Sequence, residues 1–159
     1  ILLLTSNLGA RYLSGQTAPL GFGSADTAAA RRGQQALQEA RAFFRPELMG
    51  RLDDTVLFSP LTPKELTAIA DRLLTELEAR AAAQGYALRH TAAAAQALAG
   101  DTVPPYGARE LRRRVNRAVE QALADRIAEG TAHPGTVYTA DADAEGHIIL
   151  TESDLAACV

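Results

Sequence analysis

The first sixty residues carry two short, unbroken apolar runs separated by a long polar and alanine-rich stretch. Residues 1–5, "ILLLT", and 55–58, "TVLF", are each closed within a few residues by turn-forming residues. Apolar runs of this length that lack polar alternation are typical of strands buried on both faces of a parallel sheet. The pattern therefore predicts two buried strands in this part of the chain.

The stretch between these runs divides into a loop and a helix. Residues 13–25 are rich in glycine and show no periodicity, which predicts a long loop of the kind that is usually functional or disordered. Ala, Gln, Glu and Arg dominate the residues that follow, and they lose little side-chain entropy in a helix. We expect this helix to be capped by Ser24 or Asp26, to end near Phe44, and to be followed by a short turn at Pro46.

The second part of the chain begins with the clearest helix signal of the sequence. In "LTPKELTAIADRLLTELEARAAAQG", Thr62 is suited to the N-cap, Pro63 to the first helical position and Glu65 to the third. Apolar residues then follow at helical spacing until Gly85. The pattern predicts a long amphipathic helix that ends just before this glycine.

Shorter elements follow, and together they indicate an α+β fold. Residues 86–90 alternate like a half-buried strand, 91–100 read as a capped short helix, and 108–129 read as a second long helix that ends at Gly130. "TVYTAD" and "GHIILT" alternate around a polar turn and predict an antiparallel pair. We expect a sheet of about three strands that is covered by helices, without regular βαβ alternation.

The domain boundary is expected at the prolines that follow the second apolar run. Pro60 and Pro63 interrupt the chain there, which gives a first domain of residues 1–59 and a second of residues 60–159. The chain starts without Met and inside an apolar run. We therefore expect a fragment whose first part is the remnant of a larger α/β domain.

Composition and charge exclude several classes of protein. The formal net charge of −3 argues against a general nucleic-acid or anionic-membrane binder, and the apolar N-terminal run is too short to span a bilayer. Cys158 is the only cysteine, so one copy forms neither a disulfide nor a thiolate metal site, and a reducing, cytoplasmic location is expected. The histidines at 90, 133 and 147 are scattered, which favours surface or core-edge roles over a metal site.

An arginine-rich stretch, "VPPYGARELRRRV", is the strongest local chemical signal. Leu111 and Val115 belong to an apolar stripe, whereas Arg109, Arg113 and Arg117 follow one another at four-residue spacing on another face. A helix start offers unpaired backbone N–H groups and the positive end of the dipole, so an arginine there suits a phosphate. A solvated basic face is the alternative interpretation.

Three motifs in a fixed order resemble the Clp family of AAA+ unfoldases. "LLLTSNLGA" resembles the family's sensor-1 strand, "FFRPELMGRLDDTVLFSPL" its arginine-finger segment, and "YGAREL" its sensor-2 motif. By this resemblance Asn7 is sensor 1, Arg51 is the arginine finger and Arg109 is sensor 2. It implies the end of a large ATPase domain followed by the complete small lid domain.

The resemblance implies roles for these three residues around ATP or ADP with Mg²⁺. Asn7 would orient the attacking water, Arg109 would contact the nucleotide of its own subunit, and Arg51 would reach the neighbouring subunit's site in a homo-hexamer. A turn-forming role is the alternative for Asn7. An ion pair with Glu47, Asp53 or Asp54 is the alternative for Arg51.

The chain departs from the family pattern in several places. Gly50 replaces a usual Asn before the finger arginine, and Glu110 replaces a frequent Pro after the sensor arginine. The 159 residues contain no G-x-x-x-x-G-K-[ST] motif, since the only lysine is Lys64, and no apolar strand ending in Asp-Glu. We expect that this chain alone neither binds ATP tightly nor hydrolyses it, and that its nucleotide-binding core lies upstream.

The long loop contains a candidate partner-binding segment. "APLGFGS" places Leu20, Gly21 and Phe22 between polar and glycine residues. Clp unfoldases that work with the Clp peptidase ring carry an aliphatic-Gly-Phe or aliphatic-Gly-Leu tripeptide at this place, and six such weak contacts on one ring reinforce one another. A loop that folds its Leu and Phe back onto its own domain is the alternative.

These observations lead to one expected function with three alternatives. We expect the C-terminal part of a cytoplasmic, ATP-dependent protein unfoldase that acts on polypeptide substrates as the ATPase subunit of a Clp-type protease. A ClpB-like disaggregase without a peptidase partner is the nearest alternative. A nucleic-acid-binding module that uses residues 109–117 and a stand-alone interaction domain are the others.

Overall fold

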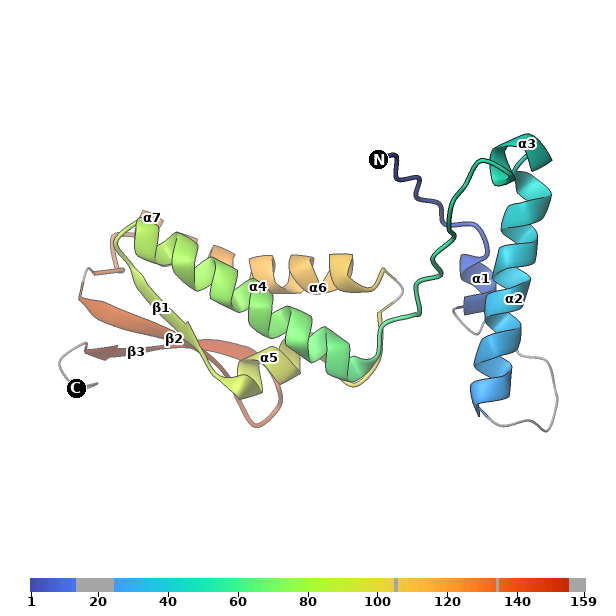
Figure 1. Ribbon diagram of the computed structural model, residues 1–159. Helices are drawn as coiled ribbons and strands as arrows, with labels where there is room; N and C mark the ends of the chain where they lie inside the picture. Colours follow the sequence, from blue (N-terminus) through green and yellow to red (C-terminus); the bar gives the residue numbers. More distant parts are fainter. Residues whose placement is uncertain (14–24, 105, 134, 155–159) are drawn as a thin grey trace. The chain divides into compact units, whose positions relative to one another are not determined.

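The computed structural model describes residues 1–13, 25–104, 106–133 and 135–154, and in residues 25–29 and 154 only the backbone. The chain forms two compact units, Ile1–Pro60 and Leu61–Val159. The first contains helices α1 (Ala10–Leu13), α2 (Ala25–Phe43) and α3 (Pro46–Met49) (Figure 1). In the part of the chain that the model covers, no helix is long and apolar enough to cross a membrane.

The long helix expected in the first unit is confirmed as α2, which ends at Phe43. Of its expected caps, Ser24 and the side chain of Asp26 lie outside the described residues, as does most of the expected loop at 13–25. The turn expected at Pro46 is the four-residue helix α3, in which Pro46 occupies the first position and needs no hydrogen-bond acceptor.

The two strands predicted in the first unit are wrong for this structure. Residues 1–7 and 52–60 have no regular secondary structure. Leu2 and Leu3 are 83% and 85% exposed, and Phe58 is 81% exposed. A strand is stable only when a neighbouring strand satisfies its backbone N–H and C=O groups, and the described residues of this unit supply no such neighbour.

In the second unit, α4 (Pro63–Ala83) has the start that the sequence predicts. The Thr62 hydroxyl accepts a hydrogen bond from the Glu65 N–H at 3.3 Å, and the Glu65 carboxylate accepts one from the Thr62 N–H at 2.7 Å. This capping box lowers the pKa of Glu65, because the backbone and hydroxyl donors of Thr62 stabilise its charged form. The helix ends before Gly85, whose φ of 86° suits a residue without a Cβ.

A three-stranded sheet follows, so the α+β class is confirmed. Its strands are β1 (Ala87–His90), β2 (Thr136–Ala142) and β3 (Ile148–Asp154), in the order β1-β2-β3. The pairing of β2 with β3 is antiparallel, as predicted, and that of β1 with β2 is parallel. A parallel pair needs a long crossover, which here carries α5 (Ala92–Ala99) and the second long helix.

The second long helix is continuous but contains one π turn. It consists of α6 (Ala108–Val115), the π turn η1 (Asn116–Glu120) and α7 (Gln121–Ala128). Its buried residues recur every four positions: Leu111, Val115, Val119 and Leu123. In a pure α-helix each step of four residues drifts by about 40° around the axis. The π turn winds more slowly, which cancels part of this drift and keeps all four side chains on one face.

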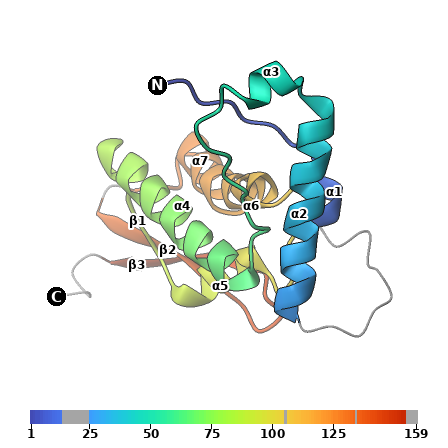
Figure 2. The same cartoon turned by 45° about the vertical axis from the view of Figure 1, so that its right-hand side comes forward.

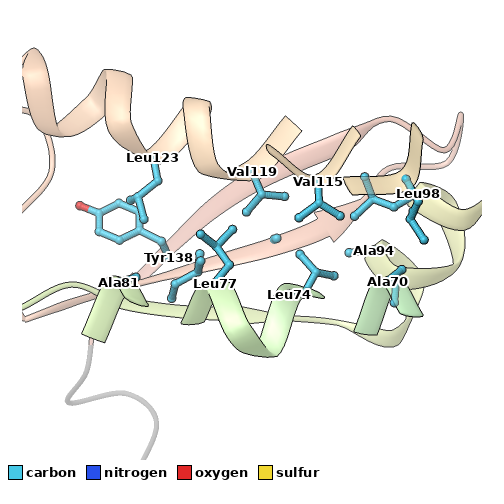
Figure 3. Packing of buried hydrophobic residues seen from close by; sticks show 14 of the residues in the cluster. Ala70, Leu74, Leu77, Ala81, Ala94, Leu98, Val115, Val119, Leu123 and Tyr138 are labelled. Carbon is cyan, nitrogen blue, oxygen red and sulfur yellow. The ribbon is translucent and has the colours of Figure 1, made fainter. Parts of the chain in front are cut away.

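The core of the second unit lies between these helices and one face of the sheet. In both views α4 and the α6–η1–α7 helix lie on the same side of the sheet (Figures 1 and 2). Figure 3 shows Leu74 and Leu77 of α4 pointing toward Val115 and Val119 of the second helix. Tyr138 of β2 is fully buried there, and its hydroxyl accepts a hydrogen bond from the His133 N–H at 2.9 Å.

His90 joins the end of β1 to α4 at the edge of this core, in agreement with the expected core-edge role. Its Nδ1 lies 2.6 Å from Glu78 Oε1 and its Nε2 lies 3.1 Å from Asp71 Oδ1. Burial of the ring disfavours the charged form most strongly. The hydrogen bonds and negative charges of Asp71 and Glu78 together outweigh burial, so the pKa of His90 is raised above its ordinary value of 6.5.

We predict that the unfolding free energy depends on pH through the protonation of His90. His90→Gln should remove this dependence. A histidine with a raised folded-state pKa contributes its full stabilisation below its unfolded pKa, near 6.5, and loses it as the pH rises through the folded pKa. The unfolding free energy of the wild type should therefore exceed that of the variant by more at pH 5.5 than at pH 8.5. Urea denaturation at both pH values measures this, and an equal difference at both contradicts the assignment.

Candidate functional site

The start of α6 is built by a tight turn and a glycine. Gly107 N–H donates to the Pro104 carbonyl at 2.8 Å, and Arg109 N–H donates to the Tyr106 carbonyl at 3.2 Å. Gly107 has φ 53° and ψ −134°, a conformation available essentially to glycine alone. No side chain caps the helix, and the N–H groups of Glu110 and Leu111 donate to the Gly107 carbonyl. The first turn therefore presents the positive end of the dipole without a side-chain acceptor.

Four exposed arginines follow this start on the side of the helix opposite its buried stripe. We call Arg109, Arg112, Arg113 and Arg117 the basic row. They line one open hollow together with Ala108, Asn116 and Gln121. The four-residue spacing of Arg109, Arg113 and Arg117 therefore places them on one surface, as the sequence predicted.

The basic row has no compensating acid among the residues that the model describes. None of its four guanidinium groups forms an ion pair there. Arg114, by contrast, turns away and donates to the Leu98 carbonyl at 3.4 Å. Glu120 of the same helix is engaged with Arg80 at 2.9 Å. A phosphate or carboxylate that reached the row would therefore meet unpaired donors.

Arg51 follows α3 in the first unit and is exposed. The ion pair with Glu47, Asp53 or Asp54 is not formed, and Asp54 Oδ1 instead accepts a hydrogen bond from Thr55 N–H at 2.7 Å. Gly50, the departure from the family pattern, has φ −70° and ψ −9°, which any residue adopts. The turn therefore does not depend on a glycine at this position.

Asn7 lies in a turn and not at the end of a strand. Its side chain is exposed, and its carbonyl accepts a hydrogen bond from Ala10 N–H at 3.2 Å. The turn is held against α2 by Gly9, which has φ 77° and on which a Cβ would lie 2.5 Å from Cα of Ala36. Sequence reasoning missed Gly9 as the residue that positions Asn7, although a glycine two residues after the polar Asn7 was a signal.

The three predicted nucleotide residues are divided between the two units. No hydrogen bond links Asn7 to Arg51 in the first unit, and Arg109 belongs to the second. Leu20, Gly21 and Phe22 lie outside the described residues. Among the described residues, no group of three His, Cys, Asp or Glu side chains is placed to hold a metal ion.

These features define a small α+β domain. Its second long helix begins at a glycine turn without a side-chain cap, and the basic row follows that turn. Residues 61–140 match the family model described as the C-terminal, D2-small domain, of ClpB protein. Because this match covers half of the chain, the chain belongs to the Clp family of chaperone ATPases. Full-length members of an ATPase family use nucleotide with Mg²⁺.

Curated relatives agree with this assignment along almost the whole chain. The chain is 32% identical over 155 residues to "Chaperone protein ClpD1, chloroplastic" of Oryza sativa subsp. japonica, which covers 95% of this chain and 16% of the relative. It is 33% identical to the "ATP-dependent Clp protease ATP-binding subunit ClpA homolog" of Pyropia yezoensis, with 94% and 19% covered. It is 32% identical to "Chaperone protein ClpB" of Staphylococcus epidermidis, with 89% and 16% covered. The chain thus spans less than a fifth of the length of these relatives.

We predict that Gly107→Ala destabilises the second unit although the added methyl group has space. The nearest atom to a Cβ would be Leu61 Cδ1 at 3.8 Å, so the cost arises from the backbone conformation and should be about 1–3 kcal/mol. Urea unfolding followed by tyrosine fluorescence measures it, since Tyr86, Tyr106 and Tyr138 lie in this unit. A wild-type unfolding free energy of the second unit in Gly107→Ala contradicts the requirement for glycine.

Proposed function

We propose that this chain is the C-terminal part of an ATP-dependent protein unfoldase subunit of the Clp type. Residues 60–159 would form its small lid domain and residues 1–59 the end of its large ATPase domain. The observation that carries the proposal is the exposed Arg109 in the first turn of a helix that no side chain caps, inside the region that matches the family's small domain. A guanidinium group without a described ion pair, placed at the positive end of the helix dipole, fits the chemistry of a phosphate.

Arg109 is proposed to bind the nucleotide of its own subunit. Its guanidinium is exposed, permanently charged and located in the first turn of the helix, near the positive end of the dipole, so it suits phosphate oxygens better than a lysine would. It contributes this binding energy only when the lid lies close to the nucleotide. Binding and release therefore shift the lid between closed and open arrangements, and this motion would act on polypeptide substrates.

Arg51 and Asn7 are proposed to act on hydrolysis. ATP with Mg²⁺ supplies the phosphoanhydride bond whose cleavage releases the energy. Arg51, which forms no ion pair with a described acid of its own unit, would stabilise the negative charge that develops in a neighbouring subunit's site, so activity would require a homo-hexameric ring. The side-chain amide of Asn7 is exposed and would orient the attacking water.

The rest of the ATPase machinery is assigned to the longer protein of which this chain is proposed to be part. The 159 residues lack a phosphate-binding glycine loop, and the relatives are more than five times longer. Experiments on hydrolysis therefore require the full-length protein.

We predict that removing either arginine abolishes ATP hydrolysis in the full-length protein. Arg109→Ala should lower kcat about 10²–10³-fold, and Arg51→Ala about 10³-fold or more, because each removes positive charge from the transition state. Steady-state ATPase assays measure both effects. Arg72→Ala, which removes an exposed α4 arginine paired only with Glu76, is the control and should retain activity. Wild-type rates for Arg109→Ala and Arg51→Ala contradict the proposal.

The segment of Leu20, Gly21 and Phe22 is proposed to dock on the Clp peptidase ring. The support is the tripeptide itself and the similarity to a relative named as a protease ATP-binding subunit. The ClpB-like alternative has support of the same grade, since the matching family model and another relative are of that type. A measurement of binding to the peptidase ring distinguishes the docking proposal from the ClpB-like alternative.

We predict that Leu20→Ala combined with Phe22→Ala in the full-length protein abolishes peptidase association. Because six weak contacts act together, a modest loss at each one should remove binding of the ring almost completely. Co-sedimentation with the peptidase ring measures association, and the ATPase rate should change less than about twofold. Ala18→Ser is the matched control in the same segment. If the wild type itself shows no association, the ClpB-like alternative is supported instead.

A further inference from the structure

Three arginines of the basic row have no role in the function proposed above. Arg112, Arg113 and Arg117 are exposed and, in the part of the chain that is described, unpaired. Like charges one helical turn apart repel each other and destabilise the helix. An anionic partner would remove this cost, so the surface is suited to one.

One phosphate chain is a poor match for the whole row. The row runs over two turns, about 12 Å along the helix axis at 1.5 Å per residue, and Arg109 at its start is the member nearest the N–H groups of the first turn. In the proposed site the charge of the nucleotide is already shared among Mg²⁺, Arg109 and Arg51. The later arginines therefore require another source of negative charge.

Many acids among the described residues already have a partner, and those of the second unit without one, Asp101, Glu110, Asp125, Glu129 and Glu145, belong to the same unit as the row. Glu65 caps α4, Asp71 and Glu78 hold His90, and several others are bonded within the units: Glu39 to Arg11, Glu76 to Arg72, Glu120 to Arg80, Asp141 to Thr91 and Glu152 to Arg126.

Two unpaired acids stand on either side of Arg51. Glu47 lies in α3 and Asp53 follows Arg51 by two residues, and both are exposed. Neither forms an ion pair within the described residues, whereas the adjacent Asp54 is held by Thr55 N–H. These two carboxylates offer charge complementary to that of the row.

We propose that Arg112, Arg113 and Arg117 of one copy of this chain bind Glu47 and Asp53 of a second copy. The inference rests on the proposed function, in which Arg51 of one copy and Arg109 of the next meet at the same nucleotide. Groups that flank Arg51 then face groups that flank Arg109 across the boundary between copies. The pairing guides Arg51 into the neighbouring site and links ring assembly to its correct placement.

The test reverses the charges on each side in the full-length protein. One variant carries Arg113→Glu with Arg117→Glu, and the other carries Glu47→Arg with Asp53→Arg. Each alone should raise the protein concentration needed for half-assembly of the nucleotide-bound ring about tenfold, because each places like charges opposite one another. Together they should restore assembly to within about threefold of wild type. Mass photometry across a concentration series measures this.

A matched control reverses the same number of positive charges at another surface. Arg72→Glu with Arg89→Glu alters two exposed arginines of α4 and β1 and should leave assembly unchanged. Restored assembly in the combined variant also shows that its subunits are folded.

The possible results distinguish this inference from the proposed function on which it rests. Weakened assembly in both single-side variants without restoration in the combined variant overturns the pairing, as does unchanged assembly in either of them. The proposed function fails by a different result, namely wild-type ATPase rates in Arg109→Ala and Arg51→Ala. Loss of ATP hydrolysis in those two variants, with no coupling between the charge-reversed sides, therefore refutes the pairing alone.

Discussion

Burial of one apolar face of the second long helix is the constraint on which the candidate site depends. Leu111, Val115, Val119 and Leu123 are buried in the core cluster that they share with residues of α4 and β2, and this packing sets the rotation of the helix about its own axis. Figure 3 shows Val115 and Val119 pointing toward α4. Since the apolar face must leave water, the arginines between these positions are turned outward onto one surface. The chemistry of the site is thus a consequence of the core behind it.

The π turn affects the positions of both the buried and the exposed side chains of this helix. Without it, residues at four-residue spacing would drift around the helix, and the fourth apolar residue would leave the core. The same correction brings Arg117 back toward the line through Arg109 and Arg113. One irregular turn therefore serves the buried face and the exposed face together, and Asn116, its first residue, lines the same hollow as the arginines.

The two units differ in how far their own residues cover apolar side chains and pair backbone and polar groups. In the second, a capping box, a paired sheet and a buried tyrosine with a bonded hydroxyl surround one apolar core, and no described buried side-chain polar atom lacks a hydrogen-bond partner. In the first, Leu2, Leu3 and Phe58 face solvent, and the segments that carry them have no strand neighbour. Exposed apolar runs of this kind are suited to contacts with a partner.

Local chemistry let the sequence alone determine most of the second unit. Thr62 with Glu65 identified the start of α4, Gly85 and Gly130 marked helix ends, and alternation identified β2 and β3, because each signal acts within a few residues. The motif around Arg109 likewise identified the family. Tertiary structure alone decided that 1–5 and 55–58 are not strands, because pairing requires a partner strand. It alone placed His90 between Asp71 and Glu78 and introduced the π turn, because both depend on how separate elements pack against one another.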